Sequence, residues 1–142
     1  SFKTYTLNIC YRKDKSKKID LKNILEKICE KAEEVVTTHG YNIIILSDRN
    51  TSSKRVAIPA LLACSSTHQY LVKSGNRTNA GLVIDTGSAR EVHHFALLAG
   101  YGAEAICPWL TYETIKTITD DFFTAQETPQ EIHGHRDRLQ GG

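Results

Sequence analysis

The sequence predicts an α/β fold of about four βα units with a mainly parallel sheet and an irregular C-terminal tail. The clearest unit is residues 80–99, where Leu82–Ile84 form a continuous apolar run typical of a strand buried on both faces. Ser88 and Glu91 have the spacing of a capping box that would begin a helix, and apolar residues follow at helical intervals. Repeated units of this kind favour a parallel sheet covered by helices, with any chemistry at the carboxyl ends of the strands.

The other elements follow from the same two periodicities, alternation for strands and a 3.6-residue repeat for helices. A cap at Asp20 and an apolar stripe from Leu21 to Val36 predict one long helix, with Gly40 as its stop. The remaining expected elements are strands at Tyr5–Cys10, Asn42–Leu46 and Ala103–Cys107, a polar loop at Asn50–Arg55, and helices at Pro59–Lys73 and Trp109–Ile118.

Four βα units correspond to half of a (βα)8 barrel or to an open parallel sheet. A half barrel has two unpaired edges and one uncovered apolar face, so we expect a partial domain that needs neighbours. We assign residues 1–118 to this domain. Residues 119–142 have no sustained period and are expected to be irregular or disordered.

Composition and charge exclude several classes of protein. The net charge of +2 is too small to indicate nucleic acid, and no apolar run approaches the ~20 residues that cross a bilayer. The segment from Arg12 to Lys18 is locally basic, and a phosphate- or RNA-binding role is one interpretation. A solvated loop is favoured because no aromatic residues are interleaved with the charges. The basic residues of this segment are Arg12, Lys13, Lys15, Lys17 and Lys18.

The four cysteines are scattered and include no CxxC pair. This spacing argues against an iron–sulfur or zinc site made within the chain. Cys29 falls in a helical pattern and Cys107 at a strand end, so both are interpreted as small apolar residues in a reducing compartment. The other two cysteines are Cys10 and Cys64.

Four stretches of the chain resemble the central region of the large glutamate synthase chain. They are "FKTYTLNICY" at Phe2–Tyr11, "ILSDRN" at Ile45–Asn50, "AIPALLA" at Ala57–Ala63 and "GLVIDTGSAREVHHFALLAGYGAEAICPWLTYETI" at Gly81–Ile115. The resemblance runs from Phe2 to Ile115 in the family's order, and we expect it to lapse beyond Ile118. It implies an α/β region that does not bind the flavin.

The family moves the amide nitrogen of glutamine onto 2-oxoglutarate. The resemblance implies that an amidotransferase domain with an N-terminal cysteine nucleophile precedes this region in the parent chain. A barrel with FMN and an iron–sulfur cluster would follow, and ammonia would pass between the two through a tunnel. None of those catalytic motifs falls in the matched stretch, so no residue is expected to be catalytic or to bind a cofactor, and Ser1 is not interpreted as a nucleophile.

Polar residues at two strand ends are the candidate site. Asp48 and Arg49 follow the second strand, and Asp85 and Arg90 follow the third, so all four could meet at one edge of the sheet. They could line a polar cavity or contact a neighbouring domain. The favoured alternative is structural: Asp48 and Arg49 pair or cap backbone, and Arg90 pairs with Asp85 or Asp48.

A metal site is not expected. His93 and His94 are adjacent, so they point about 100° apart on a helix and need a further ligand, such as His68 or Glu91. The tail histidines His133 and His135 do not form a designed site.

Three functions remain open at this point. The leading one is a non-catalytic scaffold of a glutamate synthase, inactive alone, whose partners are the amidotransferase and FMN-binding domains of the same parent chain. The alternatives are a free-standing small α/β enzyme with a site at the strand ends, or a phosphate-binding module. Neither nucleic acid nor membrane is expected as a partner. The family implies the cytoplasm, or alternatively a plastid.

Overall fold

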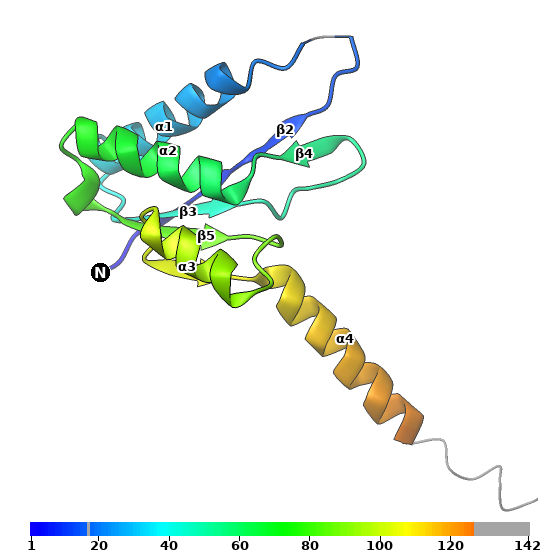
Figure 1. Ribbon diagram of the computed structural model, residues 1–142. Coiled ribbons are helices and arrows are strands. Elements are labelled where there is room, and N and C mark those ends of the chain that lie inside the picture. The colour runs from blue at the N-terminus through cyan, green and yellow to red at the C-terminus, as the bar shows by residue number, and fades with distance from the viewer. Residues whose placement is uncertain (17, 127–142) are drawn as a thin grey trace, which may run out of the picture. The chain divides into compact units, whose positions relative to one another are not determined.

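A four-stranded parallel sheet is the centre of the computed structural model, which describes residues 1–16 and 18–126 (Figure 1). Its strands lie side by side in chain order, and the register aligns Leu7, Leu46 and Ile84 in one row. The expected α/β class with a mainly parallel sheet is therefore confirmed. The strands are β1 (Thr4–Asn8), β3 (Ile43–Ser47), β5 (Gly81–Asp85) and β6 (Ala105–Cys107).

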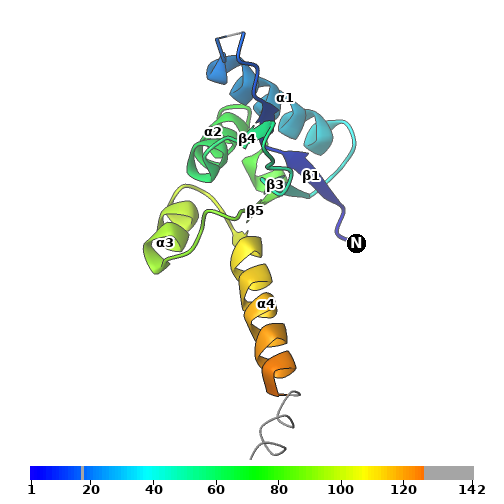
Figure 2. The same cartoon turned by 90° about the vertical axis from the view of Figure 1, so that its right-hand side faces the viewer.

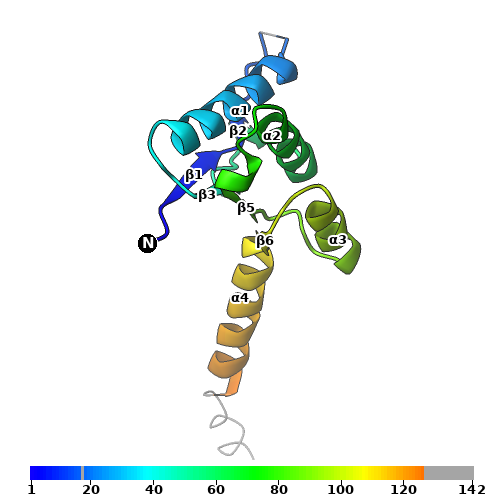
Figure 3. The same cartoon turned by 90° about the vertical axis from the view of Figure 1, so that its left-hand side faces the viewer.

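Helices α1 (Leu21–Thr37), α2 (Ala60–Lys73) and α3 (Val92–Gly100) connect successive strands. Parallel crossovers are right-handed in nearly all proteins, so connections that always step to the next strand put their helices on one face (Figures 2 and 3). Ile44, Leu46, Leu82 and Ile84 lie under these helices and are buried.

The opposite face of the sheet is only partly covered. The alternate side chains Ile43, Ile45 and Val83 are half-buried, since no helix of residues 1–110 packs on them. Among the described residues, the outer strands β1 and β6 each pair on one side only in the main sheet. These are the features expected of half a barrel.

The long helix α1 forms as its sequence predicts. Asp20 is its N-cap and accepts a hydrogen bond from the Asn23 backbone N–H at 3.1 Å. The apolar stripe faces the sheet and α2, and Gly40 follows with a φ of 66°, in the left-handed region that glycine tolerates. The buried residues of α1 are Ile28, Cys29, Ala32, Val35 and Val36.

Two short strands form where the sequence suggested one longer strand and a loop. The first strand ends at Asn8, and the chain continues as β2 (Cys10–Arg12), which pairs antiparallel with β4 (Arg55–Ala57). The expected polar loop therefore ends at Arg55, where β4 begins. A 3-10 turn, η1 (Arg77–Asn79), precedes β5.

Helix α3 begins later than its sequence suggested. The expected capping box of Ser88 and Glu91 is wrong, because Glu91 is itself the N-cap and His94 occupies the N3 position. The Thr86 hydroxyl explains the shift: Ser88 donates its backbone N–H to that oxygen at 3.1 Å, and the two hydroxyls lie 2.8 Å apart. Ser88 is therefore part of a turn and not of the helix.

Helix α4 (Trp109–Gln126) extends past the expected end at Ile118. Thr117, Thr119 and Thr124 each donate the hydroxyl to the backbone carbonyl four residues earlier, as when Thr119 Oγ1 donates to the Ile115 carbonyl at 2.8 Å. The first eight residues of the segment expected to be irregular are thus helical, and residues 127–142 lie outside the described residues. The chain divides into two compact units, one ending at Leu110 and the other beginning at Thr111.

Candidate functional site

The carboxyl ends of β3 and β5 bring three of the four expected site residues together. Ser47 is level with Asp85 in the register, so the residues after β3 lie beside the end of β5. Arg49 forms a two-pronged ion pair with Asp85, with Nε 2.6 Å from Oδ2 and a terminal nitrogen 3.1 Å from Oδ1. Ser47 also donates its hydroxyl to Asp85 Oδ2 at 2.8 Å.

Asp48 is the buried centre of this cluster, with 6% of its surface exposed. Its Oδ1 accepts the indole N–H of Trp109 at 2.6 Å and the backbone N–H of Gly87 at 3.0 Å. Its Oδ2 accepts the Thr86 hydroxyl at 2.5 Å. Three neutral donors therefore satisfy this buried carboxylate, and Arg49, whose guanidinium lies 5.4 Å from the centre of the Trp109 ring, pairs with Asp85 instead.

Arg90 does not join the cluster. It is exposed, and among the described residues it pairs with neither Asp48 nor Asp85; its backbone N–H donates to His94 Nδ1. Thr86 is a member that sequence reasoning missed, although it stands directly after β5 at the edge that holds Asp48. Trp109, which stands two residues after β6, could line the same edge on its sequence position, and the structure places it against Asp48.

The surroundings of Asp85 favour the charged form of its carboxyl group. Burial raises the pKa of Asp85, but the hydrogen bonds from Arg49, Ser47 and Cys107 outweigh burial, and the pKa lies below its usual value. The pKa of the Cys107 thiol is raised, first by burial and then by the neighbouring Asp85 carboxylate. Through these side chains the cluster links the segments that follow β3, β5 and β6.

The lowered pKa of Asp85 makes stability depend on pH. A carboxyl group whose folded pKa is depressed stabilises the fold above its unfolded pKa, and that contribution is lost as pH falls through the folded pKa. We therefore expect the free energy of unfolding to fall as pH drops below about 4. In urea titrations at pH 6 and pH 3, Asp85→Asn should be less stable than the wild type at pH 6, with a smaller gap at pH 3. The exposed control Glu30→Gln should leave the wild-type profile unchanged, and an unaltered gap for Asp85→Asn would contradict the assignment.

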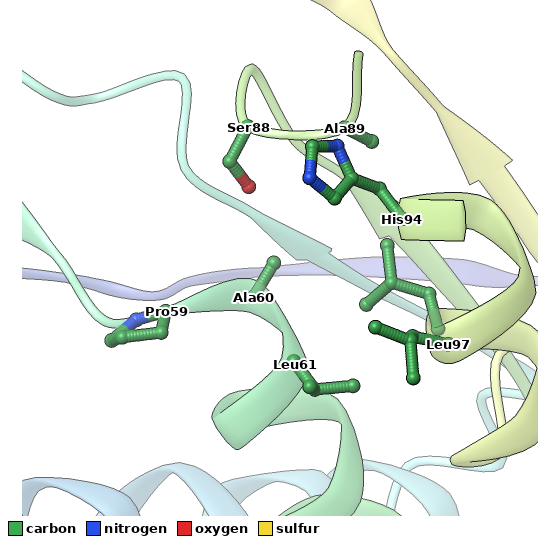
Figure 4. A pocket seen from close by; sticks show the side chains of 8 residues that line it. Pro59, Ala60, Leu61, Ser88, Ala89, His94 and Leu97 are labelled. Atoms are coloured by element: carbon green, nitrogen blue, oxygen red, sulfur yellow. The ribbon is translucent and has the colours of Figure 1, made fainter. Parts of the chain in front are cut away.

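A second feature near the strand ends is a pocket of about 240 Å³ between the start of α2 and the loop before α3 (Figure 4). Its lining is mostly apolar, and its polar side chains are Ser88 and His94. His94 Nδ1 accepts the backbone N–H groups of Arg90 and Glu91 at 3.1 and 3.3 Å, so in the neutral ring the hydrogen is on Nε2. The pocket thus offers an apolar surface with two polar groups. Its lining residues are Pro59, Ala60, Leu61, Ser88, Ala89, His94, Leu97 and Leu98.

One group among the described residues approaches metal-ligand spacing. Glu91, His93 and His94 can place one ligand atom each within 4.8 Å of one another. A metal at His94 would compete with its role in capping α3, because the acceptor nitrogen is already engaged. The group therefore fits a metal poorly.

The cysteines do not fit an iron–sulfur cluster. Cys29 lies buried in α1 and Cys64 lies buried in α2, where burial raises the pKa of Cys64 to about 11. Neither they nor Cys10 and Cys107 belong to a metal-ligand group within the described part of the chain. In the same described residues, no helix combines the length and apolar character needed to cross a membrane.

Comparison with known proteins identifies the family. The model of the glutamate synthase central domain matches residues 1–138, beyond Ile118, where we expected the resemblance to lapse. Glutamate synthase [NADH] of Schizosaccharomyces pombe is 46% identical over 91 residues, covering 64% of this chain and 4% of that protein. The Bacillus subtilis glutamate synthase [NADPH] large chain is 43% identical over 102 residues, covering 72% and 7%.

A plant relative carries the same region. Ferredoxin-dependent glutamate synthase 2, chloroplastic, from Arabidopsis thaliana is 47% identical over 98 residues, covering 68% of this chain and 6% of that protein. The chain thus spans 4–7% of the length of these relatives. With a family match over nearly its whole length, the chain belongs to the glutamate synthase central domain family.

Proposed function

We propose that this chain is the non-catalytic central region of a glutamate synthase, joining an amidotransferase domain to an FMN-containing synthase domain and shaping the path of ammonia between them. The observation that carries the proposal is the state of the strand-end cluster. Asp48 is satisfied by three neutral donors and Asp85 by Arg49 and Ser47. Side chains engaged in this way are suited to holding loops in place.

Carboxylates along a path for ammonia must not hold the ammonium cation. An unpaired carboxylate would attract the ammonium cation and retain it, whereas a carboxylate already paired with an arginine attracts cations less strongly. Asp85 is paired in this way with Arg49. Arg49 also keeps 49% of its side-chain surface exposed, which leaves it accessible to a neighbouring domain or a passing solute. The FMN and the iron–sulfur cluster of the parent enzyme would then be held outside this chain.

The coupling between the two half-reactions tests the proposal in the full-length enzyme. A coupled enzyme forms two glutamates for each glutamine consumed, because all released ammonia reaches 2-oxoglutarate. We expect Arg49→Gln to lower this ratio towards one, since an unpaired Asp85 would disturb the path and let ammonia escape. Glutamine consumption and glutamate formation are measured in the same reaction.

The matched control is Lys27→Gln, which removes one exposed positive charge from α1 and should keep the ratio at two. An unchanged ratio in Arg49→Gln would contradict a role in the ammonia path. The scaffold role is tested separately with the 142-residue chain alone: turnover of glutamine, or of 2-oxoglutarate with ammonia, would contradict it.

A further inference from the structure

The pocket at the start of α2 has both of its polar side chains at one end (Figure 4). There the hydroxyl oxygen of Ser88 and a ring nitrogen of His94 face one another. No hydrogen bond joins Ser88 to His94 in the described part of the chain, so both groups are available to a third molecule. The rest of the lining is apolar and consists of Pro59, Ala60, Leu61, Ala89, Leu97 and Leu98.

His94 can offer only a hydrogen-bond donor to a molecule in this pocket. Because its Nδ1 accepts the backbone N–H groups of Arg90 and Glu91, the hydrogen of the neutral ring lies on Nε2. Within residues 1–16 and 18–126, Nε2 has no hydrogen-bond partner. Figure 4 shows this nitrogen on the side of the ring that faces Ser88. The capping of α3 through Nδ1 holds the ring in this orientation.

Ser88 offers an acceptor, because its own hydroxyl hydrogen is already used. The Thr86 hydroxyl has one hydrogen and donates it to Asp48 Oδ2 at 2.5 Å. The hydroxyl oxygens of Thr86 and Ser88 lie 2.8 Å apart, so Ser88 must be the donor in that contact. The lone pairs that remain on Ser88 Oγ can therefore accept a hydrogen bond from a molecule in the pocket.

We propose that this pocket binds a small neutral molecule that carries a primary carboxamide on an apolar body. The carbonyl oxygen and one N–H of such an amide lie side by side, so the oxygen accepts from His94 Nε2 while the nitrogen donates to Ser88 Oγ. A carboxylate only accepts and an ammonium only donates, so each would satisfy one of the two groups and oppose the other.

The size of the pocket sets the size of the apolar body. Its volume of about 240 Å³ is below the range of about 300–1,000 Å³ that is typical of sites for drug-sized ligands, so the molecule is small. The leucine, alanine and proline side chains of the lining would contact this body and remove it from water. The site goes beyond the proposed scaffold role and does not depend on it.

The test adds benzamide, methyl benzoate and benzoate separately to the 142-residue chain and follows the backbone amide signals by NMR. We expect benzamide to bind with a dissociation constant of about 1–10 mM, as so few atoms allow, and to shift the signals of residues 59–61 and 88–98. Methyl benzoate accepts but cannot donate, so it should bind about three- to tenfold more weakly. Benzoate should bind more weakly than benzamide as well.

The variant Ser88→Ala removes the acceptor. It should weaken the binding of benzamide about three- to tenfold and leave methyl benzoate unchanged, because the ester makes no hydrogen bond to Ser88. The matched control Ser53→Ala, an exposed serine outside the pocket, should leave both affinities unchanged. If Ser88→Ala does not fold, the comparison of the three ligands on the wild-type chain decides alone. Absence of saturable benzamide binding, equal or tighter binding of either analogue, or an equal loss for benzamide and methyl benzoate in Ser88→Ala would each overturn the proposal.

Discussion

Replacing Asp48 with alanine is expected to destabilise the domain by about 3 kcal/mol, a large part of the 5–15 kcal/mol typical of a domain. The variant leaves the Trp109 indole N–H, the Gly87 N–H and the Thr86 hydroxyl without their shared acceptor. Each unsatisfied buried donor costs about 1–3 kcal/mol, and water entering the cavity recovers part of that cost. The measurement is urea unfolding followed by fluorescence.

Trp109 makes this measurement specific, because it is the single tryptophan of the chain and contacts Asp48 directly. Asp48→Asn keeps the shape and one oxygen, so we expect an intermediate loss of about 1–2 kcal/mol. The exposed control Glu30→Ala should change stability by less than about 0.5 kcal/mol. A loss in Asp48→Ala no greater than in Glu30→Ala would show that the cluster does not hold the loops.

A double-mutant cycle that combines Asp48→Ala with Trp109→Phe measures the interaction energy between these two side chains. Phenylalanine keeps an aromatic ring but loses the indole N–H together with part of the indole. Contacts that this part makes with residues other than Asp48 cancel in the cycle, so the coupling between the two positions reports the interaction of the two side chains. We expect the double variant to be less destabilised than the sum of the two single variants. Strict additivity would mean that this interaction contributes nothing to stability.

The parallel sheet could be predicted because its signal is local and repeated. Ile43–Leu46 and Leu82–Ile84 are apolar runs too short for helices, and each is followed by a turn and a helical stripe. That pattern also indicates where the strand ends meet, so Asp48, Arg49 and Asp85 could be selected as neighbours. Which of the two carboxylates Arg49 pairs with depends on loop geometry, which periodicity does not encode.

The predictions for Ser88, for Arg90 and for residues 10–12 and 55–57 were wrong for different physical reasons. Ser88 has the sequence of a helix cap, but Thr86 is two residues away and its hydroxyl engages Ser88 first. Arg90 seemed as well placed as Arg49, yet it follows the turn and remains exposed. The β2–β4 ribbon was missed because three-residue strands carry too little alternation to be distinguished from a loop.

Gly102→Ala should be among the most damaging single methyl additions in the domain, with an expected loss of about 3 kcal/mol or more. Gly102 has a φ of 113°, and a Cβ atom there would lie 2.5 Å from the Cγ and Nδ1 atoms of His68. His68 is not free to withdraw. Arg77 donates its Nε–H to His68 Nδ1 at 2.9 Å and a terminal N–H to the Gly102 carbonyl at 2.8 Å.

Two other glycines of the same fold separate the causes of this loss. Gly75 has a φ of 76° but open space around its Cα, so Gly75→Ala tests backbone strain alone and should cost about 1 kcal/mol. Gly100, the last residue of α3, has neither strain nor a close neighbour, so Gly100→Ala should be neutral or slightly stabilising. Adding His68→Ala to Gly102→Ala should recover the steric part and leave the strain. If thermal and urea unfolding show Gly102→Ala no worse than Gly75→Ala, then His68 is not held against Gly102 by Arg77.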